Sequence, residues 1–203
     1  MKKLIILFGV LFCCSISYAQ TIYTDGAVIS ADSITYEISV WHDFYYTVIN
    51  VENELYDQDL QDLNGQAVSP FDYYGAEMDM QSFQQAFFAT FTSEETAVFR
   101  DNNVKMNIFF TKNNEGRLLE VVFHVYLYKT PFAAQIPPEK FAAFEKNLKK
   151  YLRWTTVTED EKKLKFMHEM MRVPFAALAD VRVLELNPEA ERVPDSLKVV
   201  GIN

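Results

Sequence analysis

The chain has 203 residues, with 28 acidic and 19 basic side chains, a net charge of −9 at pH 7, and two cysteines, Cys13 and Cys14. An acidic chain without a basic block argues against nucleic acid as a partner, because phosphate backbones are bound by clustered lysine and arginine. Two adjacent cysteines supply neither a disulfide framework nor the ligands of a zinc ribbon or an iron–sulfur cluster.

Residues 1–19 have the pattern of an export signal. Two lysines precede an apolar run, Leu4–Cys14, and residues 17–19 (Ser-Tyr-Ala) resemble a cleavage site. The run is shorter than the ~20 residues that a membrane-spanning helix requires. Lipidation is not expected, because the bulky Phe12 precedes the first cysteine. We therefore predict a periplasmic or secreted protein with no transmembrane segment, in which residues 20–203 carry no cysteine and a net charge of −11.

The first half of the expected domain begins with two strands. Residues 34–41 and 44–51 are rich in β-branched and aromatic side chains and are separated by His42-Asp43. Residues 53–74 have little regular pattern and predict a long surface connection. Apolar residues then recur at helical spacing from Met80 to Phe91, and Ser93-Glu94-Glu95 predicts the cap of a second short helix through Phe99.

The second half shows the clearest pattern. Apolar residues alternate along 104–111 and 119–127, and residues 113–116 (Asn-Asn-Glu-Gly) between them predict a β-hairpin with one apolar face. Residues 138–154 then predict a helix, opened by proline, that places its apolar side chains on one face. Residues 159–176 fit either a helix or an edge strand, and we favour a short helical turn followed by a strand.

Strand, strand and helix thus occur twice along the chain. This order predicts an α+β fold, in which an antiparallel sheet carries helices on one face. We expect a single domain over residues 20–203, with two β-β-α units as its halves, 20–100 and 101–178, and a C-terminal extension, 179–203.

Residues 104–176 also resemble a known module. The alternating strand ending in Asn114-Glu115-Gly116-Arg117, the strand at Leu119–Phe123, the helix from Pro138 to Trp154 and the closing Val173-Pro174-Phe175 are similar to the C-terminal β-β-α-β module of TonB-type proteins. Because we expect neither the N-terminal anchor nor the proline-rich spacer of energy-transducing members, the resemblance implies a fold and protein contact rather than energy transduction. The whole chain resembles uncharacterised exported proteins of Gram-negative gut bacteria.

Few residues are marked for catalysis. Three histidines are available: His42, His124 and His168. His124 lies on the polar side of the second hairpin strand, but Glu120 would lie roughly 13 Å away along that strand, so a partner would have to come from Lys105 or Asn107. We therefore predict no catalytic residue. The alternative is a hydrolase with paired carboxylates acting on a glycan or peptide, although no motif marks the pair.

Metal and cofactor motifs are also absent from the sequence. Asp57, Asp59 and Asp62 resemble a calcium loop, but Gln61 and Asp62 occupy the fifth and sixth positions, where an EF-hand needs an oxygen ligand and a glycine. The glycines are isolated, so no phosphate-binding loop is expected. We predict no metal and no cofactor.

Aromatic residues supply the candidate binding site. Trp41, Tyr45 and Tyr46 lie close together in a strand region, and Phe71, Tyr73 and Tyr74 lie in a segment flanked by proline and glycine. Consecutive residues of a strand point to opposite faces, so at least one of these rings should face outward. We predict an exported, non-enzymatic binding protein that uses this aromatic surface to contact an envelope protein, a peptide or a glycan.

The helix at 138–154 is basic in an otherwise acidic chain. Five basic and two acidic residues lie between Glu139 and Arg153. A solvated helix face is one interpretation. The other is docking on the acidic segment Asp57–Asp62, in the same molecule or in a second copy, which would give self-association.

Overall fold

The structure is a computed structural model that describes residues 23–42, 44–69, 77–126, 136–155 and 157–186. Its centre is a six-stranded sheet with the order β1-β2-β3-β5-β4-β6. The strands are β1 (Val28–Ala31), β2 (Ile34–Trp41), β3 (Tyr45–Asn50), β4 (Met106–Asn113), β5 (Leu118–Tyr126) and β6 (Phe166–Arg172). All neighbouring strands are antiparallel. Because β3 pairs with β5, both halves of the chain share this sheet.

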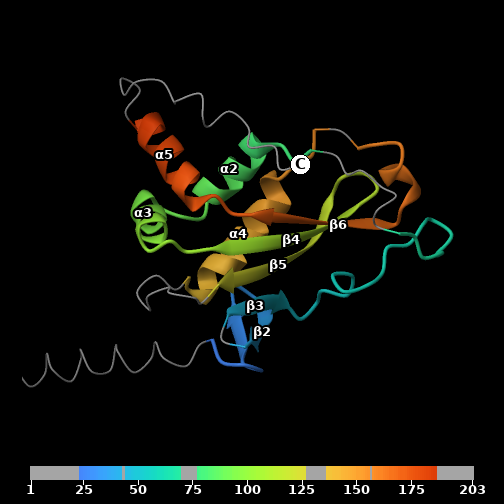
Figure 1. The fold of residues 1–203 in the computed structure, drawn as a ribbon, viewed down its shortest axis with the longest axis horizontal. Coiled ribbons are helices and arrows are strands. Elements are labelled where there is room, and N and C mark those ends of the chain that lie inside the picture. Colours follow the sequence, from blue (N-terminus) through green and yellow to red (C-terminus); the bar gives the residue numbers. More distant parts are fainter. Residues whose placement is uncertain (1–22, 43, 70–76, 127–135, 156, 187–203) are drawn as a thin grey trace, which may run out of the picture.

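Helices cover one face of the sheet (Figure 1). They are α2 (Met80–Phe88), α3 (Ser93–Asp101), α4 (Pro138–Tyr151) and α5 (Phe175–Leu186), with a short 3-10 helix, η3 (Glu161–Lys163). The predicted α+β architecture, an antiparallel sheet with helices on one face, is therefore confirmed.

The core lies between the sheet and α4. Ile108, Phe110 and Phe123 point from the strands toward this helix and are fully buried. Phe141 and Phe144 of α4 pack against Phe123 at ring-centroid distances of 5.1 and 5.9 Å. Each buried aromatic side chain removes on the order of 150–250 Å² from water. Aromatic burial thus supplies a large share of the hydrophobic stabilisation that holds the sheet and helices together.

The N-cap of α3 lies one residue before the predicted position. Thr92, rather than Ser93, is the N-cap of α3, and it forms a capping box with Glu95. The box satisfies two backbone N–H groups at the helix start. Asp79 caps α2 by accepting a hydrogen bond from the backbone N–H of Gln81.

The region that fits either a helix or a strand contains both. η3 and β6 agree with the favoured prediction of a helical turn followed by a strand. The strand ends at Arg172, however, and Pro174 precedes a new helix, α5. A strand continuing to residue 176 was therefore wrong, and part of the expected extension at 179–203 is helical. Proline has no backbone N–H to donate to a neighbouring strand, but it is well tolerated in the first turn of a helix. Pro174 therefore lies where the strand has ended and α5 begins.

The predicted surface connection is held onto the sheet. Its backbone N–H groups at Glu54 and Leu55 donate to the carboxylate of Glu120 at 2.8–3.0 Å. Farther along, the carbonyl of Gln58 lies 3.0 Å from Nε2 of His168 on β6. This connection therefore covers part of the sheet face opposite the helices. None of the helices in the described ranges is long and apolar enough to cross a bilayer.

Candidate functional site

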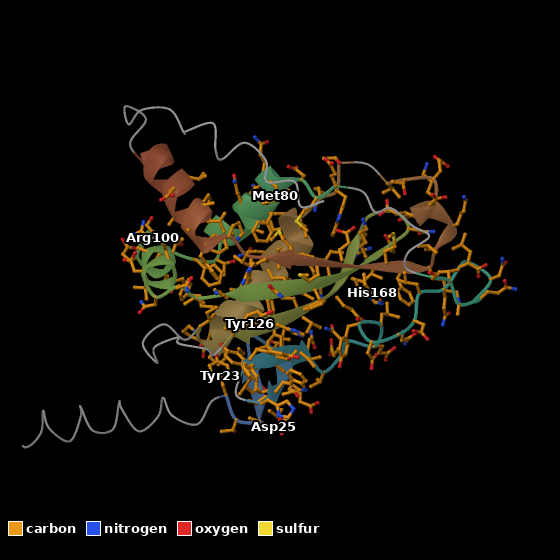
Figure 2. The ribbon with its side chains drawn as sticks, in the orientation of Figure 1. Tyr23, Asp25, Met80, Arg100, Tyr126 and His168 are labelled. Carbon is orange, nitrogen blue, oxygen red and sulfur yellow. The ribbon has the colours of Figure 1, made fainter. Side chains whose placement is uncertain are left out.

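The sheet face turned away from the helices carries a row of rings. Side chains of this open face alternate with core side chains along every strand. Trp41 lies opposite Tyr45, Thr47 opposite His124, and Phe109 opposite Val122 in the strand pairing. The ring-bearing residues therefore follow a diagonal across β2, β3, β5 and β4. In Figure 2, the labelled Tyr126 and His168 lie on this face, away from α2 and its Met80.

We call Trp41, Tyr45, His124 and Phe109 the aromatic row. The centroids of Trp41 and Tyr45 are 5.6 Å apart, those of Tyr45 and His124 are 5.0 Å apart, and those of His124 and Phe109 are 4.4 Å apart. Tyr45 and His124 are nearly parallel, with an interplanar angle of 11°. The two middle rings are therefore packed on both sides by other rings, which holds the row rigidly.

Polar groups continue the row along β5 and β4. The ring of Tyr126 lies 5.9 Å from that of Tyr45, and its hydroxyl accepts a hydrogen bond of 3.1 Å from Nδ2 of Asn107. Burial between its ring neighbours lowers the pKa of His124, because a charged imidazole loses hydration there. His124 is thus neutral near pH 7, and it presents a polar edge rather than a charge.

Both ends of the row are open to solvent. The exposed fraction of Trp41 is 55%, and Met170, which follows Phe109 across the sheet onto β6, is 57% exposed. Phe44, in the turn beside Trp41, is exposed to the same extent. Large apolar side chains at such exposure on one sheet face form an accessible surface.

The predicted site residues separate into three groups. Trp41 and Tyr45 lie together in the aromatic row, as the prediction of an outward-facing surface required. Tyr46 is a correction, because it is 1% exposed and points into the core, where it stacks on Tyr23 at 4.3 Å. Alternation along β3 dictates this, since neighbouring residues face opposite sides. Phe71, Tyr73 and Tyr74 lie outside the described residues.

Sequence reasoning missed the full row. His124 was expected on the polar side of its strand, but Phe109 was not considered at all. Asn107 does lie directly opposite His124, although its amide binds Tyr126 rather than the imidazole. The available signal was Phe109 itself, a large apolar residue out of phase with the apolar alternation of its strand.

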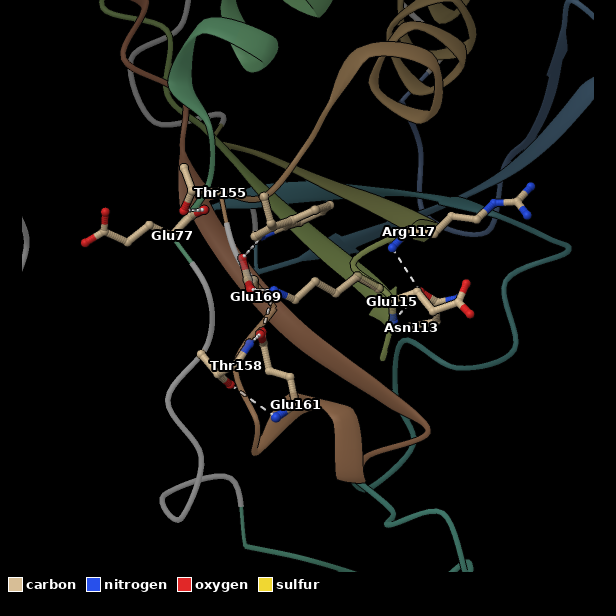
Figure 3. Close-up of polar contacts among 10 residues, drawn as sticks. Glu77, Asn113, Glu115, Arg117, Thr155, Thr158, Glu161 and Glu169 are labelled. Carbon is tan, nitrogen blue, oxygen red and sulfur yellow. Dashed lines mark hydrogen bonds and ion pairs between the residues drawn. The ribbon is translucent and has the colours of Figure 1, made fainter.

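A second cluster of ionisable groups lies on the helix side of the sheet. Nζ of Lys112 is 2.6 Å from Oε1 of Glu161 and 2.5 Å from Oε1 of Glu169 (Figure 3). Oε2 of Glu169 accepts a hydrogen bond of 2.7 Å from Nε1 of Trp154, and the lysine lies 4.7 Å from the indole centroid. The two lysine contacts are ion pairs by distance, although their angles are not those of ideal hydrogen bonds.

In this cluster two carboxylates lie on either side of one lysine, so we consider it against the predicted alternative of a hydrolase with paired carboxylates. Lys112 and Glu161 are each 1% exposed, and Glu169 is 20% exposed. The space between the carboxylates is filled by the lysine ammonium, so a substrate and an attacking water have no room there. The arrangement fits a structural ion-pair cluster, and it offers no catalytic geometry.

Comparison with known proteins identifies a similar fold but no family and no function. No family model matches the sequence, and no curated protein matches it either. The structure is similar to the crystal structure of a DUF5043 family protein from Bacteroides uniformis ATCC 8492, with a TM-score of 0.60 and 20% sequence identity. The match covers 76% of this chain and 93% of that chain. At this identity the likeness shows a shared α+β fold.

Proposed function

We propose that this chain is an exported, non-enzymatic interaction protein that binds a protein or peptide partner through the aromatic row. Export rests on the pattern of residues 1–19, which lie outside the described residues. Binding rests on one observation: four packed rings lie across the open sheet face and end in the exposed Trp41.

The composition of this face fits a protein interface. Interface cores are enriched in aromatic residues, methionine and arginine and are depleted of acidic residues. The row is flanked by Met170 and by Arg172, which lies opposite Asn107. Trp and Tyr are also the side chains that most often carry binding energy at interfaces.

The geometry favours a protein or peptide over a glycan. Sugar rings stack on a free aromatic face, whereas Tyr45 and His124 each pack against two neighbouring rings at centroid distances of 4.4–5.6 Å. What these two residues present outward is ring edges and polar tips. Ring edges carry partial positive charge and suit the carbonyl groups and aromatic faces of a polypeptide.

Packing within the row also lowers the entropic cost of binding. An interface side chain that becomes immobilised on binding costs about 0.5–1.5 kcal/mol. Tyr45 and His124 are already held by their neighbours, so little of this cost remains for them. A preorganised row of this kind is suited to act as the rigid part of an interface.

A random-peptide display library selected on the immobilised protein tests the proposal. We expect enriched peptides that bind the wild type and lose at least about tenfold in affinity with Trp41→Ala, a typical loss for an interface hot spot. Val98→Ala is the matched control, because Val98 is an exposed apolar residue on α3, away from the row. A library that yields no peptide, or peptides indifferent to Trp41→Ala, would refute the proposal, as would Trp41-dependent binding on a glycan array.

A further inference from the structure

A groove with a cationic rim lies beside the aromatic row. Its volume is about 290 Å³, and it lies where α3, β4, β6 and α5 meet. Its floor is formed by buried apolar side chains: Phe99, Val104, Val173 and Phe175. Three cations line it as well, Arg100, Lys105 and Arg172, and none of the described residues that line it is acidic.

Two of these cations have no counter-charge among the described residues. Arg100 pairs with Asp101 at 2.8 Å and approaches Asp180 at 3.9 Å. Lys105 and Arg172 are exposed, and neither makes an ion pair or a side-chain hydrogen bond with another residue in the part of the chain that the structure describes. Two exposed cations thus lie over an apolar floor in a chain whose net charge is −9.

Cations outside the groove differ in whether they pair with a carboxylate. Five lysines of the described residues pair with carboxylates at 2.5–2.8 Å: Lys112, Lys140, Lys149, Lys162 and Lys163. Three exposed lysines, Lys146, Lys150 and Lys165, pair with none of the described carboxylates. Acidic side chains outnumber basic ones in this chain, so available carboxylates are not scarce. What distinguishes Lys105 and Arg172 is their place: they line one apolar groove together, and no carboxylate of the described ranges pairs with either.

The groove and the aromatic row form one surface. Arg172 lies opposite Asn107 in the pairing of β4 with β6. Asn107 donates to the hydroxyl of Tyr126, whose ring neighbours that of Tyr45. Figure 2 labels Tyr126 at the end of β5 and Arg100 on α3. Phe109 at the end of the row and Arg172 at the groove thus belong to neighbouring same-face residue pairs of β4 and β6, so one extended polypeptide can contact both.

We propose that the groove binds an acidic segment of the partner polypeptide. A glutamate or aspartate carboxylate binds Arg172 and Lys105, and a neighbouring apolar side chain of the partner lies on the floor between Val104 and Phe175. The guanidinium of an arginine matches a carboxylate with two parallel hydrogen bonds, which gives direction as well as attraction. The inference rests on the proposed function and specifies the chemistry of its partner.

Fluorescence anisotropy with labelled peptides tests this inference. The probe is a short peptide of alternating glutamate and leucine, and its comparison peptide replaces every glutamate by glutamine. We expect the wild type to bind the glutamate peptide at least about tenfold more tightly at low salt, with the difference shrinking as salt is added. The Lys105→Gln/Arg172→Gln variant should lose that difference, whereas Lys146→Gln, an exposed charge change on α4, should keep it.

The outcomes separate the two proposals. Equal binding of the two peptides, no binding of either, or an unchanged Lys105→Gln/Arg172→Gln variant would show that the groove proposal is wrong. If Trp41→Ala still abolishes binding of the peptides selected from the display library, the proposed function stands by itself. Conversely, loss of binding through the groove variant but not through Trp41→Ala would refute the role of the row. Salt-sensitive self-association in sedimentation that the groove variant abolishes would identify a second copy as the occupant and overturn the inference.

Discussion

Removal of the buried ammonium of Lys112 should be among the most destabilising single changes in this protein. Lys112→Met keeps an unbranched apolar stem but leaves Glu161 and Glu169 facing each other without a counter-charge. Breaking a buried ion pair in this way typically costs about 3–5 kcal/mol of unfolding free energy. The whole stability of a domain is about 5–15 kcal/mol, so the loss is a large fraction of it.

A second variant shows whether uncompensated charge is the reason. Glu161→Gln, combined with Lys112→Met, removes one negative charge and supplies an amide N–H that can donate to Glu169, while its carbonyl can still accept from the backbone N–H of Thr158. We expect the double variant to recover roughly half of the loss or more, a coupling typical of groups in one network. Urea unfolding followed by far-UV circular dichroism measures both values.

The result that would refute this reasoning is specific. If the double variant is no more stable than Lys112→Met, lost packing around the lysine stem explains the loss rather than unpaired charge. If Lys112→Met costs less than about 1 kcal/mol, the cluster is not closed to solvent as the structure has it. Lys162→Met is the control, because Lys162 is an exposed lysine whose pair with Glu159 lies on the surface.

Two further predictions concern the open face. Glu120→Ala should release the connection that starts at Asn53, because the N–H groups of Glu54 and Leu55 lose their acceptor. We expect a loss of about 1–3 kcal/mol in unfolding free energy. Hydrogen exchange should become faster at those two amides and stay unchanged in the hairpin turn between β4 and β5. His124→Phe should flatten the acid dependence of stability. Burial lowers the pKa of His124 below its unfolded value of about 6.5, so the stability present above that pH is lost as pH falls through the lowered folded value. Urea midpoints of wild type and variant that fall in parallel between pH 7.5 and 5 would contradict this.

Alternation in the sequence predicted the strands that are long and apolar on one side. The expected strand at residues 34–41 matches β2, and the hairpin of β4 and β5 lies where the pattern placed it. Period-two patterning succeeds here because one face is buried against the helices and the other is not. β1 was missed because it is four residues long and is joined to β2 by Asp32-Ser33. Both have positive φ, but neither is the glycine that usually reveals such a turn.

The candidate site could be predicted in part for the same reason. Trp41 and Tyr45 are near one another in sequence, so their clustering was visible before the fold was known. His124 and Phe109 join them through strand pairing over more than sixty residues of chain, which no local pattern reveals. Tyr46 was misplaced because the prediction grouped neighbours in sequence, whereas a strand separates them onto opposite faces.

The sequence also contains a pattern that predicts the buried ion-pair cluster of Lys112. Lys112 lies two residues after Phe110 and so continues the apolar face of β4. A lysine in phase with buried residues must find a carboxylate, because an unpaired charge in the core is too costly. The identity of its partners depended on η3 and β6, whose positions the sequence left open between helix and strand.

The two faces of the sheet make stability and binding separable by experiment. Phe123 and Phe144 meet on the helix side and hold the sheet, whereas Trp41 and Arg172 are exposed on the other side. A change at an exposed residue usually alters stability by less than about 0.5 kcal/mol. Trp41→Ala and Arg172→Gln should therefore unfold at nearly the wild-type urea concentration. A loss of binding in either variant would then report on the surface itself, because the fold that carries the surface is intact.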